Sequence, residues 1–251
     1  MIIIIPMAGD SSRFFNKGYT VPKFMLPYAG RTVFDECLDS FINYYSTAKF
    51  VFIIKENYDG QIFKVEDFVK EHCKSLVIKD YSIIKLESTT KGQAETVQIG
   101  LDISGLNVSD EELVIFNIDT FRYSLEIPNH KWNALFDAYE DSSADEKKYS
   151  FAMIDSSIGH IVMTAEKKKI GPWVSTGLYI FKSAALYSNI YHKAVKAKDY
   201  NYYIAPLYNY IDNAYVLKCN KDDVVFAGTP DEYNAICRKF AKFMDSYIDW
   251  I

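Results

Sequence analysis

The residues best suited to chemistry lie in a polar segment that follows the first apolar run. This segment reads PMAGDSSRFFNKGYTVPKF (6–24) and comes directly after four isoleucines. It offers a glycine at Gly9, a guanidinium at Arg13 and an ammonium at Lys23. Backbone N–H groups of a glycine-containing loop at a strand's carboxyl end can surround phosphate oxygens, and arginine and lysine are the usual cationic partners of phosphate. The segment therefore predicts a phosphate-binding loop.

The spacing in this segment differs from that of two common phosphate loops. It contains neither GxxxxGK[ST] nor the dinucleotide pattern GxGxxG, so both of those readings are excluded. On the residues alone, an ordinary connecting loop remains the alternative. A polar excursion of this length is long for a passive connection between a strand and a helix, which favours the phosphate loop.

A second candidate segment, ESTTKGQAETV (87–97), lies where an expected strand ends and a helix begins. Its Gln93 can both donate and accept hydrogen bonds, as reading the edge of a nucleotide base requires. The alternative is a plain helix start with Thr89 or Thr90 near the N-cap.

A third candidate, FNIDTF (116–121), ends an apolar strand with the carboxylate of Asp119. An aspartate at this place can cap a helix, or it can hold a divalent cation that bridges a phosphate.

Alternating apolar runs and helical patterns must position these residues. The expected strands are 2–5, 49–55, 82–86 and 112–118, and the expected helices are 32–45, 61–73 and 93–103. This order predicts an α/β fold, a Rossmann-like core whose mainly parallel mixed sheet has helices on both faces and binds ligands at the carboxyl ends of its strands.

The second half of the chain predicts a smaller antiparallel extension. Its expected elements are strands 149–155, 160–166, 173–181, 214–219 and 223–227, a helix at 183–197, and a closing helix at 230–248 opened by Thr229-Pro230. We expect one domain over 1–251, with a nucleotide-binding core at 1–145 and an acceptor-binding part at 146–251. The acidic stretch 140–148 is the expected exposed loop and hinge.

Composition narrows the classes of partner. The net charge of -5 argues against nucleic acid or an anionic membrane surface as the main partner. Four scattered cysteines without CxxC predict reduced thiols in a cytoplasmic protein and no zinc site. The initial isoleucine run is too short for a signal peptide or a membrane span and reads as a buried strand. The oligomeric state is not indicated.

The order PMAG, SRF and PK directly after the first strand resembles the signature of nucleotidyltransferases that activate sugar phosphates and other small phosphorylated molecules. Their core is glycosyltransferase-A-like. The resemblance implies that Arg13 and Lys23 are catalytic and contact the phosphates of a nucleoside triphosphate. It assigns nucleotide binding to Met7, Ala8, Gly9, Ser11, Ser12, Gly92, Gln93 and Ala94. This chain departs from the usual pattern because Ser11 replaces a glycine and Asp10 occupies the variable position.

The resemblance also implies a metal and an acceptor site. Asp119 corresponds to a residue that binds Mg²⁺. The block AEKKKIGPWVSTGLYIFKS (165–183) corresponds to the acceptor pocket, with Glu166, Lys167, Thr176 and Gly177 as its binding residues.

A second metal-binding aspartate, which many sugar nucleotidyltransferases place two residues before a late Gly-Thr, is absent, since Phe226 and Ala227 precede Gly228-Thr229. Asp222 and Asp223 lie nearby in the sequence, and nothing in the sequence identifies either as the second metal ligand.

The activity that the resemblance implies is transfer of a nucleotidyl group to a phosphorylated small molecule with release of pyrophosphate. Small-molecule cytidylyltransferases of capsular polysaccharide biosynthesis, including a type acting on L-glutamine phosphate, are similar in size and in the PMAG opening, which favours CTP. A sugar 1-phosphate acceptor is the close competitor. Two other classes stay open: a glycosyltransferase with the same core, and a nucleotide-binding regulator without turnover.

Overall fold

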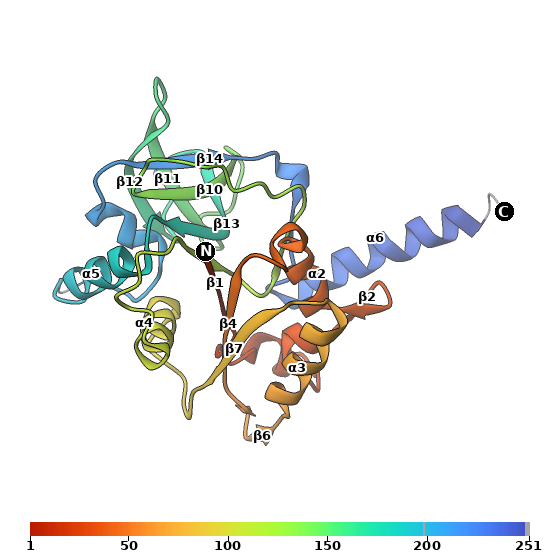
Figure 1. Cartoon of the computed structure of the whole chain (residues 1–251). Coiled ribbons are helices and arrows are strands. Elements are labelled where there is room, and N and C mark those ends of the chain that lie inside the picture. Colours follow the sequence, from red (N-terminus) through yellow and green to blue (C-terminus); the bar gives the residue numbers. More distant parts are fainter. Residues whose placement is uncertain (198, 249–251) are drawn as a thin grey trace.

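A nine-stranded mixed sheet with helices on both faces forms the centre of the computed structural model, which describes residues 1–197 and 199–248 (Figure 1). The strand order is β10-β14-β12-β11-β13-β8-β1-β4-β7. The strands are β1 (Ile2–Pro6), β4 (Lys49–Ile54), β7 (Asp80–Lys85), β8 (Leu113–Phe116), β10 (Ala134–Glu140), β11 (Ser150–Asp155), β12 (His160–Glu166), β13 (Trp173–Phe181) and β14 (Ala214–Lys218). The predicted α/β class is confirmed.

The first half of the chain builds the parallel part, in which β7, β4, β1 and β8 are neighbours. The isoleucines of β1 are fully buried on both faces of the sheet. Ile3 and Ile5 pack with α2 (Val33–Asp39) and α3 (Val65–Ser75). Ile2 and Ile4 pack on the other face with α4 (Gln93–Ser104). Each such side chain stabilises the fold by about 1.5–3 kcal/mol, and two-sided burial explains the unbroken apolar run.

The second half joins the same sheet through β13, which pairs antiparallel with β8, β10 and β11. The helices α5 (Ala184–Ala194) and η3 (Ala205–Tyr210) cover the face that α4 covers. Strand β10 was not predicted, because Asp137 interrupts its apolar run. In the structure Asp137 is buried at a bulge between β10 and β13, where Arg122 Nε donates to it over 2.9 Å.

Short elements complete the fold. They are α1 (Ser12–Phe15), η1 (Lys23–Met25), η2 (Ile42–Tyr44), η4 (Lys221–Asp223), the strand pair β2 (Pro27–Tyr28) and β3 (Arg31–Thr32), the pair β5 (Asn57–Tyr58) and β6 (Gln61–Ile62), and the pair β9 (Thr120–Arg122) and β15 (Val224–Phe226). All four cysteines are free. No helix within the described ranges is long and apolar enough to span a bilayer.

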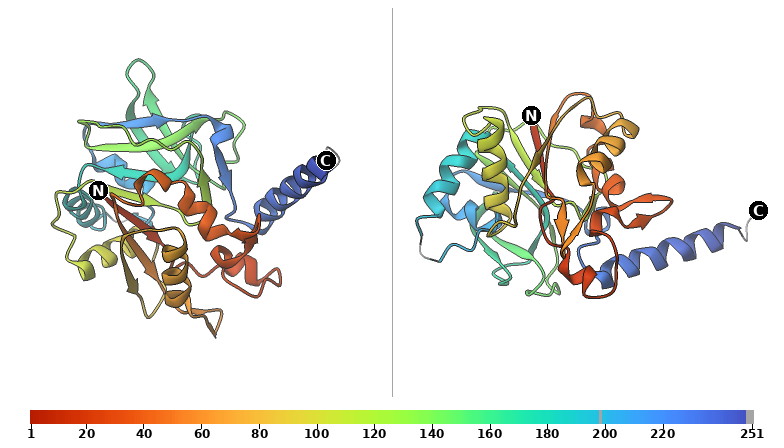
Figure 2. Two further views of the ribbon diagram at one scale, coloured as in Figure 1. Left: turned by 45° about the vertical axis from the view of Figure 1, so that its right-hand side comes forward. Right: turned by 90° about the horizontal axis from the view of Figure 1, so that it is seen from below.

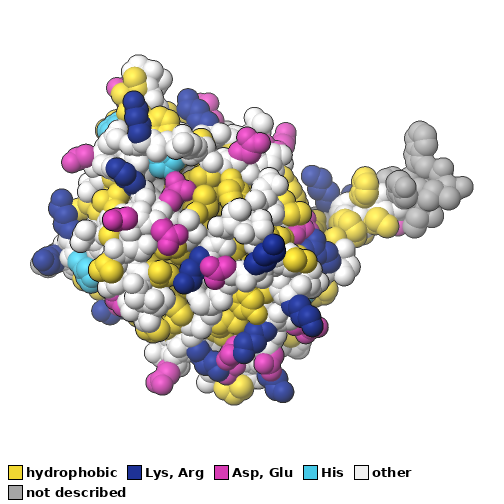
Figure 3. Space-filling model, viewed as in Figure 1, with side chains coloured by type: hydrophobic (Ala, Val, Ile, Leu, Met, Phe, Trp, Pro, Cys, Tyr) yellow, Lys and Arg dark blue, Asp and Glu magenta, His cyan; other side chains and the backbone are white. Residues whose placement is uncertain are grey.

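The last helix, α6 (Pro230–Ile248), has the bounds that the sequence predicted. A capping box opens it: Glu232 N donates to Thr229 Oγ1 over 3.3 Å, and Thr229 N donates to Glu232 Oε2 over 3.0 Å. Tyr233, near the start of α6, is buried in the hydrophobic core. The helix then projects away from the rest of the molecule, as two further views and the space-filling surface show (Figures 2 and 3).

Candidate active site

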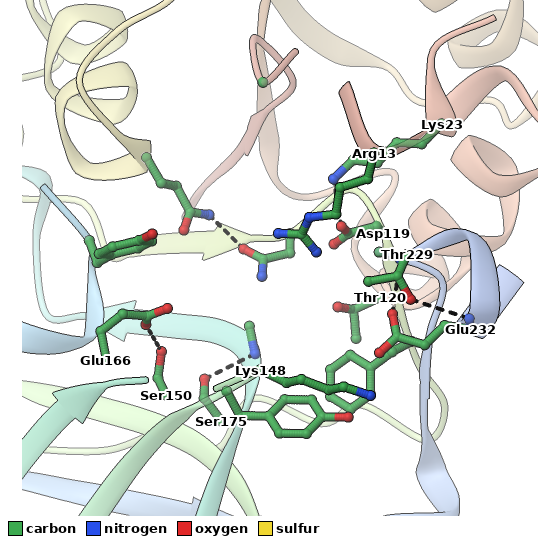
Figure 4. A pocket seen from close by; sticks show the side chains of 18 of the residues that line it. Arg13, Lys23, Asp119, Thr120, Lys148, Ser150, Glu166, Ser175, Thr229 and Glu232 are labelled. Atoms are coloured by element: carbon green, nitrogen blue, oxygen red, sulfur yellow. Dashed lines mark hydrogen bonds and ion pairs between the residues drawn. The ribbon is translucent and has the colours of Figure 1, made fainter. Parts of the chain in front are cut away.

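A cavity of about 470 Å³ lies beside the carboxyl ends of β1 and β8, a size typical of small-molecule sites. The two halves of the chain both contribute to it (Figure 4). Ten of the predicted site residues line it: Gly9, Ser11, Ser12, Arg13, Lys23, Gln93, Asp119, Glu166, Lys167 and Gly177.

The loop after β1 turns sharply at Ser11, whose φ of 54° and ψ of 19° lie in the left-handed region. This region favours glycine, so a serine can replace glycine here only at a cost in conformational energy. The Ser11 hydroxyl accepts a hydrogen bond from Lys23 N over 3.2 Å. The loop is thereby tied to the start of η1, and Arg13 in α1 and Lys23 in η1 reach the same cavity.

Asp10 does not stand as an uncompensated charge beside this loop. Its carboxylate accepts hydrogen bonds from Lys55 Nζ and from Thr89 Oγ1, the latter over 2.7 Å. Burial raises the pKa of the Asp10 carboxyl, but the hydrogen bonds from Lys55 and Thr89 outweigh this and hold that pKa below its usual value. The loop after β1 is therefore pinned to the segments that follow β4 and β7.

Cationic groups meet a carboxylate at one end of the cavity. Lys23 Nζ lies 2.5 Å from Asp119 Oδ2, and both side chains are partly buried. Figure 4 shows Arg13, Lys23 and Asp119 together, with Asp119 in the short connection between β8 and β9. Lysine, arginine and carboxylate at the end of parallel strands can bind a polyphosphate and a cation.

An amide pair lies beside this charged end. Gln93 at the start of α4 donates from Nε2 to Asn117 Oδ1 over 2.6 Å. Asn117 also lies against Gly177, whose φ of +87° and close approach to the Asn117 amide leave no room for a side chain. Asn117 was not among the predicted site residues, although its place two residues before Asp119 at the end of a strand was a usable signal.

The opposite end of the cavity carries a half-buried carboxyl group and lysines. The Ser150 hydroxyl donates to Glu166 at the end of β12. Burial raises the pKa of Glu166, and the hydrogen bond from Ser150 opposes the rise. Lys167 Nζ donates to the Tyr203 hydroxyl over 3.0 Å. Lys148, from the segment expected to be an exposed loop and hinge, also lines the cavity, and no sequence signal indicated that position.

Five predicted residues lie outside the lining and support it instead: Met7, Ala8, Gly92, Ala94 and Thr176. Met7 and Ala8 are buried below the loop. Gly92 and Ala94 pack against Tyr202, whose carbonyl accepts from Ala94 N over 2.9 Å.

The hydroxyl of Thr176 turns away from the cavity. It is fully buried and donates to Asp137 Oδ2 over 2.7 Å, so it completes the partners of the buried aspartate. Asp222 and Asp223, in η4, also lie outside the cavity lining. Neither is placed to join Asp119 at a metal.

Asp119 is the predicted metal ligand that lies in the cavity. Within the ranges that the structure describes, no group of three or more His, Cys, Asp or Glu side chains could hold a metal ion. The adjacent Thr120 lines the same cavity, is fully buried, and has a hydroxyl without a hydrogen-bond partner. Oxygen donors of this kind fit Mg²⁺, which commonly takes one or two carboxylates and completes its shell with substrate phosphates and water.

Comparisons with solved structures find proteins that resemble this chain over nearly its whole length. A nucleoside-diphosphate-sugar pyrophosphorylase from Vibrio cholerae RC9 is 35% identical, with coverage of 94% of this chain and 99% of that chain and a TM-score of 0.84. The inositol-1-phosphate CTP transferase from T. maritima is 13% identical, with coverage of 92% and 90% and a TM-score of 0.67. A UDP-glucose pyrophosphorylase complexed with UDP-glucose is 14% identical, with coverage of 96% and 98% and a TM-score of 0.70. The last two share the fold. No family model and no curated protein matches the chain.

Proposed function

Because this chain belongs to the nucleotidyltransferase family, we propose that it transfers a nucleotidyl group from a nucleoside triphosphate to a phosphorylated small molecule and releases pyrophosphate. The observation that carries the proposal is the contact between Lys23 Nζ and Asp119 Oδ2, inside a cavity that the loop after β1 also lines. A cationic loop and a carboxylate at the carboxyl ends of parallel strands suit a triphosphate with its cation.

The reaction needs no nucleophile from the protein. A phosphate oxygen of the acceptor attacks the α-phosphorus, a new P–O bond forms, and the bond between the α-phosphorus and the bridging oxygen breaks as pyrophosphate leaves. Arg13, Lys23 and the N–H groups of the loop 9–13 align the phosphates and offset their charge. Neither cysteine nor histidine occurs among the described residues of the cavity lining, in accord with direct transfer.

A divalent cation, Mg²⁺ in this proposal, adds further neutralisation of the phosphate charge when bound beside Asp119. In the structure Lys23 compensates that carboxylate. If Asp119 held such a cation, Lys23 would be free to pair with the phosphates of the triphosphate.

We assign the nucleotide to the first part of the chain, where Gln93 and Asn117 offer donors and acceptors to a base or ribose. The acceptor then lies toward Glu166 and Lys167, with Gly177 between the two ends. Glu166 suits a hydroxyl or amine, and the lysines suit the acceptor's phosphate.

Two acceptors are candidates, each for its own reason. The name of the 35%-identical relative, a nucleoside-diphosphate-sugar pyrophosphorylase, favours a sugar 1-phosphate and an NDP-sugar product. The PMAG opening and the length of the chain favour CTP with L-glutamine phosphate in capsular polysaccharide biosynthesis. We place the sugar 1-phosphate first, because it rests on a match over nearly the whole chain.

Pyrophosphate release tests the proposal. The protein is incubated with Mg²⁺, each of the four common nucleoside triphosphates, and glucose 1-phosphate, other sugar 1-phosphates, L-glutamine phosphate or no acceptor. We expect release only when one triphosphate and one acceptor are both present. Nucleotide binding without pyrophosphate release under every condition refutes the enzyme and supports the regulator. Consumption of an NDP-sugar by transfer to a hydroxyl acceptor supports the glycosyltransferase.

A further inference from the structure

A second carboxylate faces Asp119 across the cavity. It belongs to Glu232, in the first turn of α6. A Cβ added to Gly228 would lie 2.7 Å from Asp119 Oδ2 and 3.6 Å from Glu232 Oε2. Two carboxylate oxygens therefore approach one point from different elements, and the lack of a side chain at Gly228 leaves that point open.

The charges around this point are unbalanced. Lys23 compensates Asp119 at 2.5 Å, whereas Glu232 makes no ion pair with any residue that the structure describes. Its Oε2 accepts only the capping hydrogen bond from Thr229 N. An unpaired carboxylate at Glu232 beside that of Asp119 favours the entry of a further cation.

An orphaned hydroxyl provides independent support. Thr120 is fully buried and lines the cavity, and its Oγ1 has no hydrogen-bond partner. Figure 4 draws Thr120 below Asp119 and beside Glu232. A buried polar atom without a partner costs free energy, so its presence here indicates a partner that binds with the substrate.

We propose that Glu232 holds the divalent cation together with Asp119. It takes the role of the aspartate that many sugar nucleotidyltransferases have two residues before the late Gly-Thr, and that this chain lacks. This inference rests on the proposed function and deepens it. The position that such an aspartate would take is Phe226, whose ring packs on Tyr149 at 5.2 Å between centroids. The second carboxylate then comes from the first turn of the following helix.

A purely structural role is the rival explanation, because Glu232 also completes the capping box of α6. The variant Glu232→Gln distinguishes the capping role from the cation-binding role. Glutamine keeps the capping hydrogen bond, since Gln serves at this position as Glu does, but it removes the charge that a divalent cation needs. Asp231→Asn is the matched control: it removes one negative charge from the same helical turn, at an exposed residue outside the cavity lining.

The experiment measures Mn²⁺ bound to the full chain, by electron paramagnetic resonance of free Mn²⁺, with a non-hydrolysable nucleoside triphosphate analogue present. Each of the four common bases is tried with the unmodified protein first. Wild type, Glu232→Gln, Asp231→Asn and Asp119→Asn are then compared, with thermal unfolding as the folding control. We expect Glu232→Gln to weaken Mn²⁺ binding about tenfold or more, with an unchanged unfolding midpoint. Asp231→Asn should bind Mn²⁺ as wild type does.

Two results overturn the inference in different ways. If Asp119→Asn weakens Mn²⁺ binding and Glu232→Gln does not, Glu232 only caps α6, and the proposed function stands. If wild type binds none of the four analogues and no Mn²⁺, the proposed function fails together with the inference.

Discussion

Replacing Asp10 with asparagine tests how the loop after β1 is held in place. The change keeps the size of the side chain and removes its charge. Lys55 Nζ then loses its anionic partner and keeps only neutral ones: the amide oxygen at position 10, Thr89 Oγ1 at 3.0 Å and the ring of Tyr58 at 4.8 Å. The ammonium stays buried while its charged partner is gone, so the folded state loses free energy.

The magnitude follows from the exposure of the two side chains. The Lys55 side chain is 6% exposed and the Asp10 side chain is 50% exposed. Removing one partner of a fully buried pair costs about 3–5 kcal/mol, and an exposed pair contributes about 0–1 kcal/mol. Because water reaches this pair from the Asp10 side only, we expect Asp10→Asn to lower the free energy of unfolding by about 1–2 kcal/mol.

Replacing the other partner of the pair, Lys55→Met, should weaken nucleotide binding while lowering the free energy of unfolding only slightly. The half-exposed carboxylate of Asp10 can be hydrated, so the loss of stability should be at most about 1 kcal/mol. Its uncompensated charge then faces a triphosphate, and a repulsion on the order of 1 kcal/mol raises the Kd about fivefold. The double variant, which combines Asp10→Asn with Lys55→Met, lacks the carboxylate charge and should bind the triphosphate more tightly than Lys55→Met alone.

Wild type, the two single variants and the double variant form a double-mutant cycle, measured by urea denaturation and by nucleotide titration. The pKa of Asp10 is lowered in the folded state, so the pair's contribution is complete above the ordinary aspartate pKa and is lost as the pH falls through the lowered one. The stability difference between wild type and Asp10→Asn should therefore shrink in acid. A coupling energy near zero at neutral pH, or a difference that grows in acid, refutes the reasoning.

Three further replacements probe the cavity and its support. Lys23→Ala should lower turnover by about 10²-fold with the fold intact, because it removes one preorganised charge, and near-normal pyrophosphate release contradicts that role. Gly228→Ala should lower turnover at least about tenfold without unfolding the chain, since its Cβ would lie 2.7 Å from Asp119 Oδ2; unchanged turnover in the same assay argues against a fixed carboxylate. Arg122→Leu should lower the free energy of unfolding by about 3 kcal/mol or more in urea, because it leaves the fully buried Asp137 unpaired, and a loss below about 1 kcal/mol is incompatible with that pairing.

The sequence by itself determined the elements whose patterns are local. The four isoleucines at 2–5 predicted a strand buried on both faces, and the structure has it at the centre of the parallel part. The closing helix could be read because Thr229-Pro230 forms a local start signal. The polar residues that follow the strands were also predicted to lie at one site, because parallel strands bring their carboxyl ends to one edge of the sheet.

Tertiary structure decided what depends on partners distant in the chain. Strand β10 contains a buried aspartate, which is tolerated only because Arg122 and Thr176 reach it. The neutralisation of Asp10 by Lys55 could not be read from the sequence, because the two residues are brought together only when β1 and β4 pair. Glu232 was not among the predicted site residues, because its approach to Asp119 beside Gly228 exists only in the folded chain. Charge pairing across the sheet edge is a property of three-dimensional proximity, which local patterns do not encode.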